Sequence, residues 1–169
     1  YPPALFAHLV SLAPSHQLAW DCATGNGQVA IGLARHFDRV VATDASAAHI
    51  DHAFRHERIA YRVEPAEATS LDAASVDLVT VGQALHWFDL DQFYAEVRRV
   101  LRTGGVIVAW CYGRCTVAPD IDAIIDRYYV EIVGPFWPPE RIFVESGYRT
   151  LPFPFARVPL PAFDMQAEW

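Results

Sequence analysis

The sequence is poor in the features that mark secreted, metal-binding or membrane-spanning proteins. Its three cysteines make neither a disulfide framework nor a zinc-binding spacing, and we expect Cys111 and Cys115 to be ordinary thiols. No apolar run approaches the ~20 residues that a membrane-spanning helix needs. The first residues also lack the charged and apolar regions of a secretion signal. We therefore expect a cytoplasmic protein without a membrane partner.

Positive charge is scarce as well. The 13 basic residues, all of them arginine, stand against 20 acidic ones, which gives a formal net charge of -7 at pH 7. We expect no nucleic-acid partner, because binding to a phosphate backbone depends on clustered basic side chains. The one basic cluster, Arg98, Arg99 and Arg102, falls on a predicted helix, and we interpret it as a solvated helix face.

Hydrophobic residues make up 53% of the 169 residues and charged residues 20%, a balance typical of one globular domain. Short apolar runs alternate with segments of helical periodicity. The predicted strands are 18–22, 40–43, 59–63, 75–81 and 106–110, and the predicted helices are 2–12, 28–37, 46–58 and 91–101, the last ended by 103–105. This alternation predicts an α/β fold, a three-layer doubly wound and mostly parallel sheet with helices on both faces.

The chain is organised around a glycine turn between the first predicted strand and the helix after it. Asp21 closes the strand, and Gly25 and Gly27 follow in the turn. Glycines permit a tight turn and let a ligand approach the main chain closely. Asp44 closes the second strand, where a carboxylate can bind the hydroxyls of a ribose. The pattern predicts a site for a nucleotide-like ligand, whereas Asp77, inside an apolar strand, is interpreted as structural.

The pattern changes after residue 111. A further amphipathic helix is predicted over 120–133, followed by a short helix over 140–146 and an extended stretch rich in proline and phenylalanine over 151–163. We expect residues 1–111 to form the ligand-binding core. Residues 112–169 are predicted to be a helical and Pro/aromatic-rich lid or insertion of the same domain, packed over the carboxyl edge of the sheet.

Together these features resemble the class I S-adenosylmethionine-dependent methyltransferases, specifically the small-molecule type 11 group. The resemblance covers residues 18–110, and its motifs are the Asp-x-x-x-Gly-x-Gly turn, the acid of the second strand, Ala66-Glu67, Asp77-Leu-Val and Arg99-Val-Leu-Arg-Thr-Gly-Gly105. Residues 84–89 and 134–141 resemble a narrower subgroup, the trans-aconitate methyltransferases. The resemblance implies a Rossmann-like fold with seven strands, and we expect the last strands of that sheet to be missing from this chain.

The resemblance implies S-adenosyl-L-methionine as the cofactor of the 1–111 core, and a role for each matched position. The methionine part would lie against Asp21 and the backbone around Ala23, Gly25 and Gly27, where Ala23 replaces the usual first glycine. Asp44 would bind the ribose. The remaining positions would be Ala45 and Ala66 beside the adenine, Glu67 at its amino group, and Gly82 and Gln83 at the sulfonium.

The acceptor is expected against His86 and Trp87. His86 is the candidate catalytic residue, as a base for an acceptor that must lose a proton, and its alternative role is a hydrogen bond to the substrate or a loop carbonyl. Phe136 and Trp137 are predicted to form an aromatic wall over the substrate, or else a surface for a second subunit of a homodimer. No metal is expected, and a helical row of histidines, His49, His52 and His56, is interpreted as a solvated face.

The predicted function is methyl transfer from S-adenosylmethionine to a small-molecule acceptor, through a carboxylate or hydroxyl oxygen. Two alternatives remain open. The turn also satisfies the Gly-x-Gly-x-x-Ala pattern of NAD(P)-dependent oxidoreductases, although Asp21 would stand where a pyrophosphate approaches. The second alternative is a catalytically silent cofactor-binding or regulatory domain.

Overall fold

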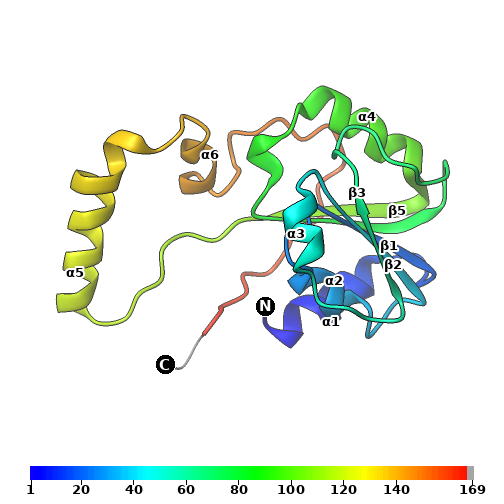
Figure 1. The fold of residues 1–169 in the computed structure, drawn as a ribbon, viewed down its shortest axis with the longest axis horizontal. Helices are drawn as coiled ribbons and strands as arrows, with labels where there is room; N and C mark the ends of the chain where they lie inside the picture. The colour runs from blue at the N-terminus through cyan, green and yellow to red at the C-terminus, as the bar shows by residue number, and fades with distance from the viewer. Residues whose placement is uncertain (167–169) are drawn as a thin grey trace.

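A computed structural model describes residues 1–166, so residues 167–169 of the predicted lid or insertion lie outside the described residues. The domain is built on five parallel strands in the order β3-β2-β1-β4-β5 (Figure 1). The strands are β1 (Leu18–Cys22), β2 (Arg39–Asp44), β3 (Ile59–Val63), β4 (Val76–Gly82) and β5 (Leu101–Trp110). The sheet confirms the predicted doubly wound α/β fold, and residues 1–166 contain no further strand.

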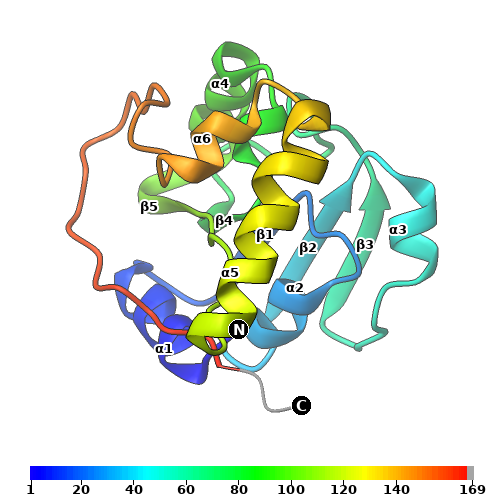
Figure 2. The same cartoon turned by 90° about the vertical axis from the view of Figure 1, so that its left-hand side faces the viewer.

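Helices cover both faces of the sheet, as predicted. On one face α1 (Pro3–Leu12) and α2 (Gln28–Leu33) bury Leu9 and Leu33 against the strands. On the other face α4 (Leu90–Val100) buries Phe93 and Val97. The short α3 (Ala47–Asp51) lies beside β2 and β3 at the far edge of the sheet (Figure 2). The result is the three-layer arrangement that alternating strands and helices require.

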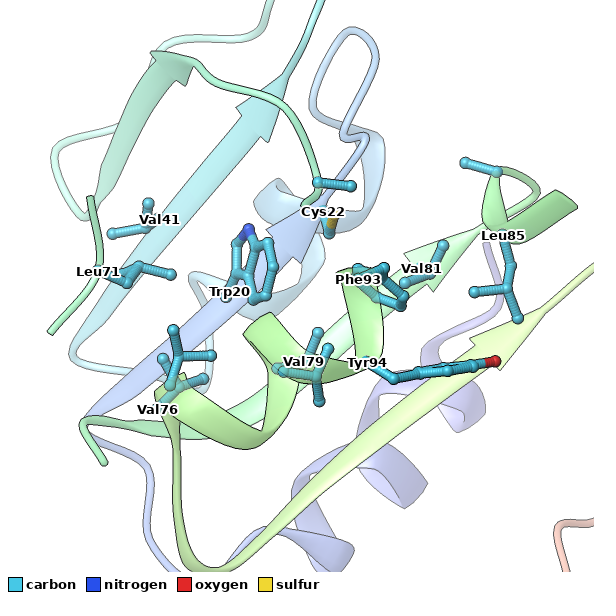
Figure 3. Close-up of a cluster of buried hydrophobic side chains, with 14 of the residues drawn as sticks. Trp20, Cys22, Val41, Leu71, Val76, Val79, Val81, Leu85, Phe93 and Tyr94 are labelled. Carbon is cyan, nitrogen blue, oxygen red and sulfur yellow. The ribbon is translucent and has the colours of Figure 1, made fainter. Parts of the chain in front are cut away.

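The core on the α4 face is centred on Trp20 of β1 (Figure 3). Neighbouring strand residues point to opposite faces, so Ala19 belongs to the other core and Trp20 packs at a ring-centre distance of 6.1 Å from Phe93. The indole is fully buried, and its Nε1 donates a hydrogen bond to the Thr43 hydroxyl at 2.9 Å. A buried indole therefore keeps its polar atom satisfied, and it joins β1 to β2 at the same time.

Two helices end earlier than predicted. The α2 helix ends at Leu33 rather than at residue 37, and α3 ends at Asp51 rather than at residue 58. Tertiary hydrogen bonds explain the second difference: Phe54 N donates to Asn26 O at 3.1 Å, and the Tyr61 hydroxyl donates to Phe54 O at 2.7 Å. The chain after α3 is therefore attached to the glycine turn and to β3 instead of continuing its helix.

The predicted placement of Arg102 on a helix is wrong. The α4 helix ends at Val100, one residue before the predicted end, and β5 begins at once with Leu101 instead of at residue 106. Arg102 therefore lies in β5, where it forms an ion pair of 3.0 Å with the fully buried Asp77. Asp77 also accepts hydrogen bonds from Gln17 N and Leu18 N, both at 2.9 Å. The carboxylate thus fixes the start of β1 at the amino edge of the sheet, which agrees with its interpretation as structural.

The segment after β5 has two parts with different packing. Its elements are α5 (Pro119–Arg127), a π-helical turn (Tyr128–Val133), a 3-10 turn (Gly134–Phe136) and α6 (Arg141–Glu145). Figure 1 shows α5 standing away from the sheet, and none of its residues is buried. Val144 of α6 and Leu151 are buried in the domain. Side chains between residues 143 and 155 therefore pack against the domain core, whereas α5 buries none, and the position predicted for the segment over the carboxyl edge of the sheet remains a prediction. Within residues 1–166, no helix is long and apolar enough to span a bilayer.

Candidate functional site

A small pocket lies at the carboxyl ends of β1 and β4. Its volume is about 140 Å³, and four of the predicted cofactor-binding residues line it: Asp21, Ala23, Gly25 and Gly82. A larger hollow of about 430 Å³ lies between β5 and residues 147–160, but none of the predicted site residues lines that hollow. The structure thus brings together residues from the tips of two strands, which in an open parallel sheet is the usual place for a ligand.

Asp21 is the buried charge of this pocket. Its side chain is 1% exposed, and it accepts hydrogen bonds from the hydroxyls of Thr24 and Thr80, the latter at 2.9 Å. Burial raises its pKa from 3.8 to about 6, and the two hydroxyl donors act in the opposite direction. A carboxylate held in this way has a strong tendency to accept a positively charged ligand group, because such a group would offset the cost of its burial.

The two glycines of the turn have different reasons to be glycine. Both have left-handed backbone angles, with φ of +57° at Gly25 and +87° at Gly27. A methyl group at Gly25 would enter open space on the pocket side, whereas at Gly27 it would come within 2.2 Å of the Tyr61 hydroxyl oxygen. Gly25 therefore leaves room for a ligand, and Gly27 leaves room for the packing of β3. Ala23 also has a left-handed angle, with φ of +54°, at a cost of about 1 kcal/mol.

Asp44, at the end of β2, is hydrogen-bonded to the backbone of the glycine turn. One carboxylate oxygen accepts a hydrogen bond from Gly25 N at 2.8 Å. The other oxygen accepts from Ser46 N at 2.9 Å and lies 3.1 Å from Nδ1 of His49. The two parts of the site that the sequence placed on separate strands are therefore in contact, and His49 belongs to this contact rather than to a solvated face alone.

The predicted adenine-side residues follow β2 and β3. Ala45 is exposed and Ala66 is buried. Glu67 accepts a hydrogen bond from the backbone N–H of Asp89 at 3.0 Å, which ties it to the first turn of α4. None of the three lines the pocket. Their predicted contacts with an adenine ring remain a prediction.

Gly82 and Gln83 connect the end of β4 to the end of β5. A methyl group at Gly82 would lie 3.2 Å from the Trp110 ring, so a side chain there would require the ring to shift. Gln83 has a φ of +61°, and its N–H donates to Trp110 O at 2.9 Å. Its side-chain amide exchanges two hydrogen bonds with the backbone of Tyr112, at 2.8 and 3.2 Å. This contact fixes the chain that leaves β5 above the pocket.

The predicted acceptor-side residues are not all together. His86 lies in the 3-10 turn Leu85–Trp87, is 9% exposed, and its Nδ1 is 2.9 Å from the hydroxyl of Tyr148. Burial lowers the pKa of His86, and the Arg141 guanidinium lowers it further. Trp87 packs beside the imidazole at a ring-centre distance of 4.5 Å but is 59% exposed.

Phe136 and Trp137 lie on the segment that leaves α5. Phe136 is 82% exposed, and Trp137 packs against Tyr129 and under the Arg141 guanidinium. Neither residue lines the pocket at the ends of β1 and β4. The aromatic wall over a substrate therefore remains a prediction.

Sequence reasoning missed several residues of the site. Tyr1 and Tyr112 line the pocket from segments outside the regular elements, and their ring centres are 6.3 Å apart. Tyr148 reaches His86 across 62 residues of sequence. Thr24 had a usable signal, because a hydroxyl three residues after Asp21 in a tight turn can return to that carboxylate. The tyrosines had none, since their positions depend on how loops fold over the sheet.

Comparison with known proteins finds methyltransferases. The family model described as "Methyltransferase domain" matches residues 20–109. A solved structure of a candidate type II methyltransferase from Anaeromyxobacter dehalogenans is 52% identical, with a TM-score of 0.87 over 95% of this chain and 68% of that one. A candidate methyltransferase of Dictyostelium discoideum is 35% identical over 88% of this chain and 59% of its own length.

A more distant structure shares the fold. Geranyl diphosphate methyltransferase, solved in complex with S-adenosylmethionine, is 22% identical with a TM-score of 0.56, over 79% of this chain and 63% of its own. The chain spans between half and three fifths of the length of the first curated relatives it matches. The match to the family model, the 52% identity and the shared sheet lead to one conclusion: the chain belongs to the methyltransferase domain family and has its Rossmann-like fold.

Proposed function

We propose that this chain is the cofactor-binding part of an S-adenosylmethionine-dependent methyltransferase that acts on a small-molecule acceptor. One observation carries the proposal: the buried Asp21 carboxylate, the open side of Gly25 and the tip of β4 meet in one pocket, with Asp44 bonded to the turn beside it. The acceptor oxygen is proposed to be a carboxylate or a hydroxyl. The carboxylate is suggested by the resemblance of residues 84–89 and 134–141 to the trans-aconitate methyltransferases.

The residues present fit this cofactor. S-adenosylmethionine carries positive charge on its amino group and its sulfonium, and Asp21 is a buried carboxylate whose charge has no cationic partner among residues 1–166. The open side of Gly25 allows the methionine part to approach the main chain. Asp44 would take the ribose hydroxyls, and Glu67, with Ala45 and Ala66, would take the adenine.

The cofactor supplies a methyl group on a sulfonium, which is a leaving group that needs no further activation. The protein must then align the acceptor oxygen and exclude water. We assign alignment to the 3-10 turn that carries His86 and Trp87, with Phe136 and Trp137 on the far side of the acceptor. A homodimer is the alternative for Phe136 and Trp137, in which a second subunit would cover these side chains in place of the acceptor.

Titration calorimetry with S-adenosylhomocysteine tests the cofactor site. We expect micromolar binding by the native chain and a loss of at least about tenfold for D44A, because two hydroxyl contacts would be removed. D51A, which removes an exposed carboxylate from α3, should bind like the native chain. Binding of NAD in place of the homocysteine compound would favour the oxidoreductase alternative, and failure of both to bind would refute the proposal.

Methyl transfer is measured separately, with labelled S-adenosylmethionine and a panel of small carboxylates and phenols. Transfer to one of these compounds is the expected result. Tight cofactor binding with no transfer to any acceptor would support the alternative of a catalytically silent domain.

A further inference from the structure

The contact between His86 and Tyr148 holds the imidazole from outside its own loop. Tyr148 follows α6 in a tight turn in which it and Gly147 both have φ of +61°. Val144 before this turn and Leu151 after it are buried in the domain, 3% and 6% exposed. A left-handed tyrosine between two buried anchors is a conformation that the surrounding packing must maintain. The buried residues on both sides of the turn thus hold the Tyr148 phenol against Nδ1 of His86.

The surroundings of the phenol oxygen decide which group donates. The backbone of Leu85 and His86 acts to lower the pKa of the Tyr148 phenol. Burial has the larger effect and raises the pKa of the phenol above its ordinary value, so Tyr148 keeps its proton at neutral pH. Within residues 1–166, the Tyr148 hydroxyl has no other acceptor than Nδ1 of His86, at 2.9 Å. A protonated phenol with one acceptor within reach donates its hydrogen to that acceptor, which here is Nδ1 of His86.

We propose that Tyr148 is a positioning residue that holds the neutral imidazole of His86 in the tautomer with its proton on Nε2. An imidazole that accepts the phenol proton bond at Nδ1 has only Nε2 on which to carry its own hydrogen. His86 then offers an N–H donor, and it has no free lone pair with which to take a proton from the acceptor. The proposal therefore favours the alternative role of His86, a hydrogen-bond donor, over that of a base.

The charges around His86 favour the same neutral form. Burial lowers its pKa, the Arg141 guanidinium acts in the same direction, and Glu140 acts against them. With Tyr148 these are the titratable and charged groups that influence the ring. A neutral Nε2–H donor suits an acceptor oxygen that is already ionised at neutral pH, because such an oxygen needs alignment but no base. This last step rests on the proposed function, while the tautomer itself does not.

The tautomer is measured by NMR on the ¹⁵N-labelled native chain without any ligand. Long-range ¹H–¹⁵N correlation distinguishes a protonated ring nitrogen from an unprotonated one, and the H86Q variant identifies the His86 signals by their loss. We expect Nε2 protonated and Nδ1 unprotonated near neutral pH. In Y148F the ratio of the two tautomers should shift by about fivefold, which corresponds to ~1 kcal/mol, the net contribution of one hydrogen bond.

Y94F is the matched control. The Tyr94 hydroxyl donates to Pro152 O at 2.8 Å, so this variant also removes one tyrosine hydrogen bond between the core and residues 147–160. It should leave the His86 tautomer unchanged. Protonation of Nδ1 in the neutral native ring, an unchanged ratio in Y148F, or an equal shift in Y94F would overturn the proposal. Because S-adenosylhomocysteine binding is measured independently, failure of the tautomer proposal is distinguishable from failure of the cofactor site.

Discussion

Replacing Asp21 by asparagine should make the ligand-free protein more stable and at the same time weaken its cofactor site. Burial raises the Asp21 pKa from 3.8 to about 6. Since one pKa unit corresponds to about 1.4 kcal/mol, ionising this carboxyl in the fold costs about 3 kcal/mol more than in the unfolded chain. Asparagine removes that cost, but it forms weaker hydrogen bonds with the Thr24 and Thr80 hydroxyls, which reduces the gain in stability by about 1 kcal/mol. We expect D21N to gain about 1–2 kcal/mol in free energy of unfolding at pH 7.

The stability difference between the native chain and D21N should depend on pH. The folded state binds the Asp21 proton more tightly than the unfolded chain does, so this group lowers stability as pH rises from about 4 to about 6 and has a constant effect above that. Urea denaturation of the native chain and D21N at pH 4, 5, 6 and 7 measures the difference directly. The stability gain of D21N should be present at pH 7 and absent at pH 4. D51N, an exposed carboxylate change, is the control. A D21N protein that is less stable at pH 7, or a gain that is the same at every pH, would refute the reasoning.

Ligand binding completes the test. A cationic ligand group beside Asp21 favours its charged form, so binding of S-adenosylhomocysteine should strengthen as pH rises to about 6 and then level off. D21N should bind at least about tenfold more weakly at pH 7 and lose this pH dependence, because removal of one partner from a buried charged contact costs 2 kcal/mol or more. Calorimetry over the same pH series measures both effects.

Other predictions separate ligand contact from folding. G25A should cost about 1 kcal/mol of stability and weaken S-adenosylhomocysteine binding, while G27A should unfold at much lower urea because its methyl group meets a phenol; the opposite order would contradict the roles given to the two glycines. R102M should lose about 2–3 kcal/mol in urea denaturation by leaving a buried carboxylate without its cation, and R35M, at an exposed position, should lose almost nothing. Once an acceptor is known, H86Q, whose amide nitrogen replaces Nε2, should keep more methyl transfer than H86N, and equal losses would argue against a donor role.

The sheet could be predicted because its strands are short apolar runs, and the central strands β1, β2 and β4 are buried along nearly their whole length. The position of Asp44 opposite the glycine turn followed from the same rule, since carboxyl ends of neighbouring parallel strands meet at one edge. The predicted nucleotide-type pocket follows from residues close together in sequence, such as Asp21 and Gly25. The local sequence pattern was sufficient to predict features that depend on residues close together in the chain.

The errors lie where distant contacts override local pattern. The pattern of residues 52–58 predicted a helix, but the helix ends at Asp51, and Phe54 N donates a hydrogen bond to Asn26 O in the glycine turn. The sequence pattern predicted Arg102 on a helix with its neighbouring arginines, but Arg102 lies in β5 and forms an ion pair with the buried Asp77. Neither partner is visible in a window of ten residues, and helical propensity contributes only a few tenths of a kcal/mol at each position, too little to oppose such contacts.

The hydrogen bond from Gly25 N to Asp44 has a consequence for how a ligand is received. The glycine turn already has its shape before anything binds, because the carboxylate of the next strand holds its backbone. A ligand that enters therefore loses its own freedom but does not have to order the loop, which would otherwise cost about 1–2 kcal/mol for each residue fixed. Recognition at this edge of the sheet is accordingly close to lock-and-key, and the entropy of shaping the pocket is lost once, when the chain folds.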